Sequence, residues 1–233
     1  MKEWSKSIAL AVLLFLVIRA FLIQAFKIPT GSMEDTILVG DFLLVNKLAY
    51  GSSSPWRLPL TSVEIPGFSI PGYTSPARGN IVVFKYPLDH SIDYVKRFMA
   101  VGGDTIQMRD KVVYVNNRPL DEPYVKHEDP MVRREGSQMY ESGKFEWQYQ
   151  YLTEEAKTKL QGNYRATRDN FGPLVVPPGK YFCMGDNRDF SSDSRYWGFV
   201  DRGLIEGRPI ILYFSWDRKY WMPRFGRIGM IIR

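Results

Sequence analysis

One long apolar run near the start of the chain constrains its fold more than any other feature. Residues 8–26 read IALAVLLFLVIRAFLIQAF, and only Arg19 and Gln24 interrupt the apolar side chains. At ~1.5 Å per residue, a helix of this length approaches the ~30 Å thickness of the hydrocarbon core of a bilayer. The run therefore predicts a transmembrane helix at residues 8–26, preceded by a short tail at residues 1–7.

Two other interpretations of the run stay open, a cleavable signal peptide and a helix buried inside the protein. The run is long for the core of a signal peptide, and no small-x-small cleavage site follows it, so an uncleaved anchor is favoured. Lys2 and Lys6 favour a cytoplasmic tail by the positive-inside rule, although Lys27 beyond the run weakens this signal. We then expect a single-pass protein of the cytoplasmic membrane whose remaining chain lies on the extracytoplasmic side.

The composition is that of a folded protein with a basic surface. Of the 233 residues, 45% are hydrophobic and 24% are charged, and the net charge is +6. A positive charge suits nucleic acid or an anionic membrane surface. The sequence has no zinc-ligand spacing, phosphate-binding glycine loop or dense basic tract, so we expect membrane phospholipid as a partner and no nucleic acid. Cys183 is the only cysteine, which excludes an internal disulfide and argues against a thiolate metal site.

After the apolar run, most of the chain predicts short antiparallel strands. Residues 81–86 (IVVFKY) and 111–115 (KVVYV) are rich in β-branched and aromatic side chains. A more polar and aromatic stretch in the middle of the chain breaks this pattern. The predicted fold class is therefore mostly β, with an antiparallel β domain behind the transmembrane helix. We expect the main domain at residues 27–104 and 183–233, and an inserted smaller region at residues 105–182.

A candidate nucleophile directly follows the apolar run. Pro29 cannot continue a helix, and Thr30-Gly31-Ser32 then places two hydroxyl groups around a glycine. A serine held at a glycine turn can act as a nucleophile, with backbone N–H groups nearby to receive an oxyanion. Most Gly-Ser pairs stand in ordinary loops, so this stretch alone does not decide between a loop serine and a catalytic one.

A catalytic serine needs a base, and the candidates are His90, His127 and a lysine. Neither histidine stands in a triad-like sequence, so a Ser-His-Asp mechanism is poorly supported. Residues 93–99 read DYVKRFM. If they form a strand, alternation places Lys96 on one face between the aromatic side chains of Tyr94 and Phe98. A dry apolar pocket would lower the pKa of this lysine enough for it to act as a base. The alternative is a lysine whose stem packs while its amine reaches water.

Residues 185–200 form a second polar stretch of interest, GDNRDFSSDSRYWGFV. The stretch is too polar for a core strand and too rich in turn-forming residues for a helix. Its charged side chains could pair into a network that holds one loop shape, with Ser191 or Ser192 orienting the lysine amine. The alternative is a solvated loop, in which isolated ion pairs contribute little.

Three stretches in this order resemble bacterial type I signal peptidases. They are PTGSM at 29–33, RGNIVVF at 78–84 followed by DYVKR at 93–97, and MGDNRDFSSDSRYWGFV at 184–200. The third stretch is highly specific, and with the apolar run the resemblance covers most of the chain outside the insert. It implies a membrane-bound serine endopeptidase that removes signal peptides from secretory preproteins after small-x-small sites, with no metal and no cofactor.

The resemblance also implies roles for individual residues. Ser32 would be the nucleophile, Lys96 its general base, and the Ser32 N–H and Thr30 hydroxyl the oxyanion hole. The substrate would add as an extended β-strand beside these groups. By their position in the matching stretches, the residues expected to line its shallow apolar pockets are Phe26, Ile28, Ile37, Val83, Tyr94 and Val95.

Four residues of the third stretch would support the catalytic pair. The resemblance implies that Ser191 hydrogen-bonds Lys96, that Asp193 and Arg195 form a salt bridge, and that Gly185 leaves room beside the site.

The sequence departs from the family pattern at two positions near these residues. Asp35 stands where the family usually has a proline, and Phe190 replaces a usual asparagine. Neither change removes a catalytic group.

Two alternative functions stay open, another Ser/Lys processing peptidase of similar fold and an inactive membrane-tethered binding protein. Cleavage of a full-length preprotein distinguishes among the three.

Overall fold

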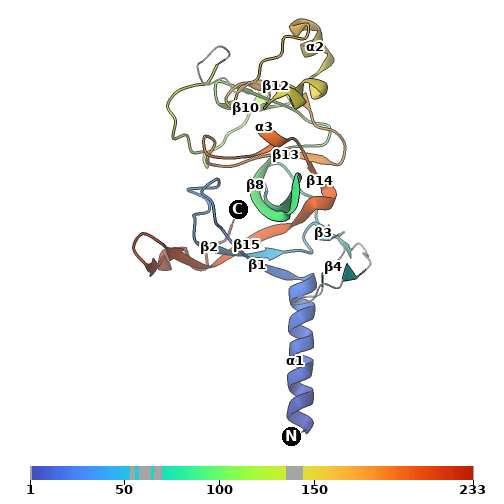
Figure 1. Ribbon diagram of the computed structural model, residues 1–233, viewed down its shortest axis with the longest axis vertical. Coiled ribbons are helices and arrows are strands. Elements are labelled where there is room, and N and C mark those ends of the chain that lie inside the picture. The colour runs from blue at the N-terminus through green and yellow to red at the C-terminus, as the bar shows by residue number, and fades with distance from the viewer. Residues whose placement is uncertain (1, 53–55, 58–63, 66–69, 135–143, 233) are drawn as a thin grey trace.

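The computed structural model describes residues 2–52, 56–57, 64–65, 70–134 and 144–232. Figure 1 shows helix α1 (Lys2–Phe21) projecting like a stalk from a body made mainly of β-strands. The larger sheet lies next to this helix, and the smaller sheet lies with helix α2 (Glu154–Leu160) at the far end of the body. The predicted fold class, mostly β with antiparallel sheets, is confirmed.

The larger sheet has eight strands in the order β1-β2-β15-β7-β8-β13-β14, with β16 paired to β15. All of its pairings are antiparallel. The strands are β1 (Ile23–Lys27), β2 (Asp41–Asn46), β7 (Ile81–Tyr86), β8 (Asp89–Val101), β13 (Lys180–Met184), β14 (Val200–Asp201), β15 (Ile205–Asp217) and β16 (Met222–Pro223). Because β1 stands at the end of this order, one of its sides is a free sheet edge in the described structure.

The smaller sheet has four strands in the order β11-β10-β9-β12. They are β9 (Thr105–Arg109), β10 (Val112–Val115), β11 (Arg118–Pro119) and β12 (Phe171–Val175). Two short pairs, β3 (Gly51–Ser52) with β6 (Ile70–Pro71) and β4 (Trp56–Arg57) with β5 (Glu64–Ile65), complete the strands. The remaining elements are η1 (Glu146–Tyr151), α3 (Ser194–Trp197), η2 (Arg202–Leu204) and η3 (Phe225–Arg227).

The predicted boundary of the insert at residue 182 falls inside a strand of the larger sheet. Strand β13 begins at Lys180 and pairs with β8, so its first residues do not belong to the smaller sheet. One hydrophobic cluster also joins Ile106 and Val113 of the smaller sheet to Met99 and Met184 of the larger one. The two sheets therefore share a core, and the division of the chain into two domains stays a prediction.

The predicted transmembrane helix is wrong at its carboxyl end. Helix α1 ends at Phe21, and the last apolar residues form strand β1, in which Ile23 pairs with Asn46 and Phe26 with Leu43 of β2. The cross-strand hydrogen bonds of this pairing satisfy the backbone groups that a longer helix would have satisfied internally. Among the described residues, no helix has both the length and the apolarity needed to cross a bilayer.

Candidate active site

Ser32 lies in the loop that connects β1 to β2. The base of this loop is closed by backbone hydrogen bonds from Ile28 N–H to the Asp41 carbonyl (2.9 Å) and from Gly40 N–H to the Ile28 carbonyl (3.0 Å). The buried Met33 side chain anchors the loop in the hydrophobic core directly after Ser32. The serine is therefore held on a loop that is fixed at both ends and packed underneath.

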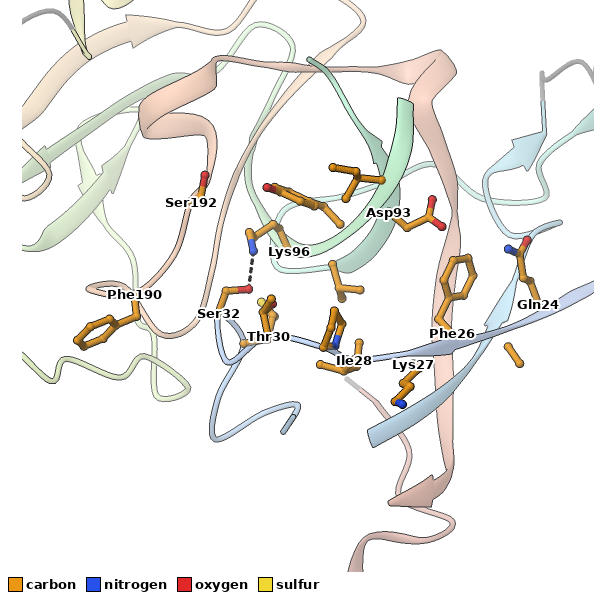
Figure 2. A pocket seen from close by; sticks show the side chains of 16 residues that line it. Gln24, Phe26, Lys27, Ile28, Thr30, Ser32, Asp93, Lys96, Phe190 and Ser192 are labelled. Carbon is orange, nitrogen blue, oxygen red and sulfur yellow. Dashed lines mark hydrogen bonds between the residues drawn. The ribbon is translucent and has the colours of Figure 1, made fainter. Parts of the chain in front are cut away.

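Lys96 of strand β8 forms a hydrogen bond with this serine. The Lys96 Nζ and Ser32 Oγ atoms lie 2.5 Å apart, as the dashed line in Figure 2 shows. Both residues are buried, with 4% and 8% of their surfaces exposed. The Lys96 amine also lies 5.1 Å from the centre of the Tyr94 ring, as the predicted strand alternation requires. The structure thus brings together a serine and a lysine that stand 64 residues apart.

Burial lowers the pKa of Lys96 below the ordinary lysine value of 10.5. The Asp193 carboxylate opposes this shift, but the loss of water around the amine outweighs it. The two histidines lie elsewhere: both are exposed, and the His127 Nδ1 atom lies 3.9 Å from an Asp189 oxygen. Neither histidine lines the cavity that holds Ser32, so Lys96 is the base that the geometry offers.

The loop after strand β13 packs directly against the serine. A Cβ atom at Gly185 would lie 2.4 Å from the Ser32 carbonyl oxygen and 2.3 Å from the Ser191 hydroxyl oxygen, so a side chain at this position would clash with both. The Asn187 N–H donates to the Ser32 carbonyl at 3.1 Å. The Thr36 hydroxyl donates to the Asp186 carboxylate at 2.7 Å. Backbone and side-chain bonds together hold the serine loop against this second loop.

Two buried ion pairs give this second loop its shape. Asp186 accepts hydrogen bonds from Arg97 at 2.7 and 2.9 Å. Asp193 accepts two bonds of 2.8 Å from Arg195, the salt bridge that the resemblance implied. Burial would raise the pKa of Asp193, but the Arg195 guanidinium overcomes this effect and holds the pKa below its ordinary value. The alternative of a solvated loop is wrong, because these four side chains are buried.

The expected hydrogen bond between Ser191 and Lys96 is absent from the described residues. The Lys96 amine bonds Ser32 instead, and the buried Ser191 side chain lies against Gly185. The neighbouring Ser192 lines the cavity beside Lys96. Of Ser191 and Ser192, Ser192 is therefore the one whose residue lines this cavity.

A cavity of about 520 Å³ opens beside the Ser32–Lys96 pair. Four residues of the predicted substrate pocket line it, namely Phe26, Ile28, Tyr94 and Val95. Ile37 and Val83 do not: both are fully buried in the hydrophobic cluster that includes Ile28, because their side chains point into the core. The lining also includes residues that the sequence did not single out for substrate binding: Gln24, Ala25, Lys27, Pro29, Met33, Ile92, Asp93, Phe190 and Ser192.

The predicted oxyanion-hole donors also stand at this cavity. Thr30 is exposed on its wall, two residues before Ser32. Within the described part of the chain, neither the Thr30 hydroxyl nor the Ser32 N–H donates to another group. Two donors beside one nucleophile are thus free to stabilise a developing negative charge. No group of three or more His, Cys, Asp or Glu side chains among the described residues is placed to hold a metal ion, and the absence of a cofactor stays a prediction.

The segment of the insert around Lys126 lies against the serine loop, a contact that the sequence did not predict. Lys126 exchanges backbone hydrogen bonds with Asp186 and Arg188, at 2.9 and 3.0 Å. Its amine pairs with Glu34 at 3.2 Å and lies 3.9 Å from Asp35.

Asp35 has a φ angle of 71°, which a proline ring cannot adopt. The aspartate that stands here in place of the family's usual proline therefore changes the turn itself.

Comparison with known proteins places the chain in a family. The family model described as "Signal peptidase, peptidase S26" matches residues 1–214. The chain belongs to the S26 signal peptidase family. It is 37% identical to signal peptidase I of Pseudomonas aeruginosa, over 98% of this chain and 78% of that protein. It is 34% identical to signal peptidase I of Aquifex aeolicus, over 92% of this chain and 85% of that protein.

One solved structure is also similar to part of the chain. A signal peptidase I from Enterococcus faecalis is 29% identical, and the match covers 58% of this chain and 97% of that one with a TM-score of 0.38. Membership of the S26 family makes this protein a serine peptidase.

The pH dependence of this peptidase is expected to follow the titration of Lys96. Only the neutral amine can accept the Ser32 proton, so kcat should rise with pH through a pKa below 10.5 and then level off. The measurement is kcat against pH on a peptide substrate, with enzyme stability checked at each pH. His90→Gln and His127→Gln are matched controls that should leave the profile unchanged. A rise that begins only above 10.5 would exclude a buried lysine as the base.

Proposed function

We propose that this peptidase removes signal peptides from secretory preproteins, with Ser32 as nucleophile and Lys96 as general base. The observation that carries the proposal is the 2.5 Å hydrogen bond between Ser32 Oγ and the buried Lys96 amine. A neutral lysine at this distance accepts the hydroxyl proton as the serine oxygen attacks the scissile carbonyl carbon. The ammonium then returns the proton to the departing amine, leaving an ester on Ser32. Water hydrolyses this ester with Lys96 again as the base.

The cavity supports an extended, largely apolar substrate segment. Its walls come from β1 on one side and from the first half of β8 on the other, as Figure 2 shows around Phe26 and Asp93. Strand β1 is the edge of the larger sheet, so its outer backbone groups are available to pair with a substrate strand. Small side chains at the −1 and −3 positions suit a shallow cavity lined by residues such as Ile28 and Val95. A small-x-small specificity is part of the proposal.

The Thr30 hydroxyl is proposed as the second oxyanion donor, beside the Ser32 N–H. Thr30→Val keeps the shape of the side chain but removes the donor, so kcat should fall by about 10²–10³-fold with little change in KM. Thr30→Ser is the matched control and should keep most of the activity. Steady-state kinetics on one peptide substrate measure both variants. A Thr30→Val enzyme with wild-type kcat would remove Thr30 from the oxyanion hole.

Association with membrane phospholipid is also part of the proposal, with the active site on the extracytoplasmic face where secretory preproteins emerge. Two sets of exposed apolar side chains support it. Helix α1 exposes Ile8, Leu10 and Phe15, each by more than half. The segment around β16 exposes the aromatic rings of Trp221 and Phe225, by 79% and 71%. Co-sedimentation of the full chain with phospholipid vesicles checks this part, and a protein that stays in the supernatant contradicts it.

Cleavage of a purified preprotein tests the proposed function. The wild-type enzyme, in detergent or in liposomes, should release the signal peptide with and without a metal chelator. A matched preprotein with bulky residues at −1 and −3 should stay uncut. Binding of the preprotein without cleavage would favour the inactive binding protein. Cleavage of the enzyme's own chain alone would favour a different Ser/Lys processing peptidase.

A further inference from the structure

Phe190 is a large apolar side chain held in an exposed position beside the active site. It is 66% exposed, whereas Ser191 on one side is buried and the Asp189 side chain on the other is only 1% exposed. The Asp189 carboxylate accepts a hydrogen bond from the Asp129 N–H at 2.8 Å and one from Lys111 at 3.2 Å. With both neighbours fixed, the backbone of Phe190 is fixed as well. An aromatic ring held rigidly in solvent gains hydrophobic free energy when a ligand covers it.

Phe190 lines two cavities. It lines the 520 Å³ cavity that holds Ser32 and Lys96, together with Ser192. The same two residues line a second cavity of about 400 Å³, whose other walls include Ser191 and Tyr196. The two cavities therefore adjoin at Phe190 and Ser192, beside the catalytic pair.

Ser32 lies between the β1 side of the first cavity and the two residues that the cavities share. In Figure 2, Gln24 and Phe26 lie on one side of Ser32, and Phe190 and Ser192 lie on the other. A substrate whose acyl part occupies the space between β1 and β8 must continue past Ser32 toward Phe190. The second cavity is therefore placed for the residues that follow the scissile bond.

We propose that Phe190 and the second cavity form a subsite for the first two residues after the scissile bond, and that the subsite favours an apolar side chain there. This inference rests on the proposed function, since it assigns a specificity to the leaving-group side of that reaction. The chemistry of the wall supports it. The Phe190 and Tyr196 rings offer apolar area, and the Asp189 carboxylate is already paired with Lys111 and Arg168.

The test is a set of peptides that are identical up to the scissile bond and carry leucine, alanine or glutamate at the first or the second position after it. The wild-type enzyme should cleave a leucine peptide with a kcat/KM about tenfold above that of the alanine peptide at one of these positions. Phe190→Ser should reduce this ratio to about one, and Phe190→Leu should keep it because the apolar surface is retained. Leu88→Ser is the matched control, since Leu88 is 71% exposed and lies outside both cavities.

Each other outcome overturns the subsite in a distinct way. If Phe190→Ser keeps the wild-type ratio, Phe190 does not contact the leaving segment. If it slows all peptides equally, with a lower Tm, its role is structural. A wild-type preference for the glutamate peptides contradicts an apolar subsite. Cleavage of none of the peptides by the wild-type enzyme refutes the proposed function, and the subsite with it.

Discussion

Replacing Lys96 with methionine is expected to lower kcat for preprotein cleavage by more than about 10³-fold, and Ser32→Ala is expected to have a similar effect. Methionine matches the length of the lysine stem but cannot accept a proton, so the Ser32 hydroxyl loses the amine to which it is hydrogen-bonded. In the proposed mechanism the two residues act as a unit, so the double variant should be little worse than either single one. Single-turnover assays with a large excess of enzyme provide the sensitivity that this comparison needs.

The stability of the Lys96→Met variant separates loss of chemistry from loss of fold. A lysine whose pKa is lowered by burial binds fewer protons folded than unfolded, so it destabilises the protein at every pH below 10.5. Methionine removes this penalty, and the Tm at pH 7 should equal or exceed that of the wild type.

Lys47→Met is the matched control for the activity measurement. Burial also lowers the pKa of Lys47, but its partner is Glu206 and it lies outside the Ser32 cavity. This variant should keep wild-type kcat. A Lys96→Met enzyme that cleaves as fast as Lys47→Met would reject Lys96 as the base.

Replacing Asp193 with asparagine is expected to have the largest effect on stability, about 3–5 kcal/mol of unfolding free energy. Asp193 and Arg195 both have fully buried side chains, and the carboxylate also accepts the Gly185 N–H at 3.1 Å. Asparagine keeps the shape but leaves the guanidinium charge uncompensated inside the protein. For a chain of this size the Tm should fall by roughly 10 °C. Urea unfolding and calorimetry measure the two quantities.

Asp201→Asn controls for the loss of an ordinary ion pair. Asp201 is 55% exposed and pairs with Lys180 at 2.9 Å on the surface, so its loss should cost less than about 1 kcal/mol. The double variant Asp193→Asn with Arg195→Met removes the stranded charge and should be less destabilised than the sum of the single changes. Equal effects of Asp193→Asn and Asp201→Asn would contradict the role of the buried pair.

The pH dependence of stability has a definite sign for this pair. The folded-state pKa of Asp193 lies below its ordinary value of 3.8, so the folded protein holds fewer protons on this group than the unfolded chain. The stabilisation is therefore present above pH 3.8 and is lost as the pH falls through the lower, folded-state pKa. Asp193→Asn should remove this contribution to acid unfolding.

Local patterns in the sequence were sufficient for much of the fold and of the site. β-branched and aromatic segments predicted the antiparallel strands, because side-chain shape and strand preference act over a few neighbouring residues. The Gly31-Ser32 turn and the Tyr94-Val95-Lys96 alternation marked two functional candidates. The point at which the apolar run changes from helix α1 to strand β1 was not predictable in this way. Both parts of the run are apolar, and β1 forms because it pairs with β2, where Phe26 lies opposite Leu43.

The chemical groups available for the reaction can be read from the residues: a serine at a glycine turn, a lysine between aromatic side chains, and a loop dense in charged residues. Which of these groups meet depends on the folded chain. The tertiary structure placed Lys96 2.5 Å from Ser32, buried Ile37 and Val83 below the cavity instead of on its wall, and left Phe190 exposed where it lines two cavities. The physical reason is that the pKa of a lysine and the exposure of a ring depend on neighbours brought together by strand pairing and core packing, and not on adjacent residues.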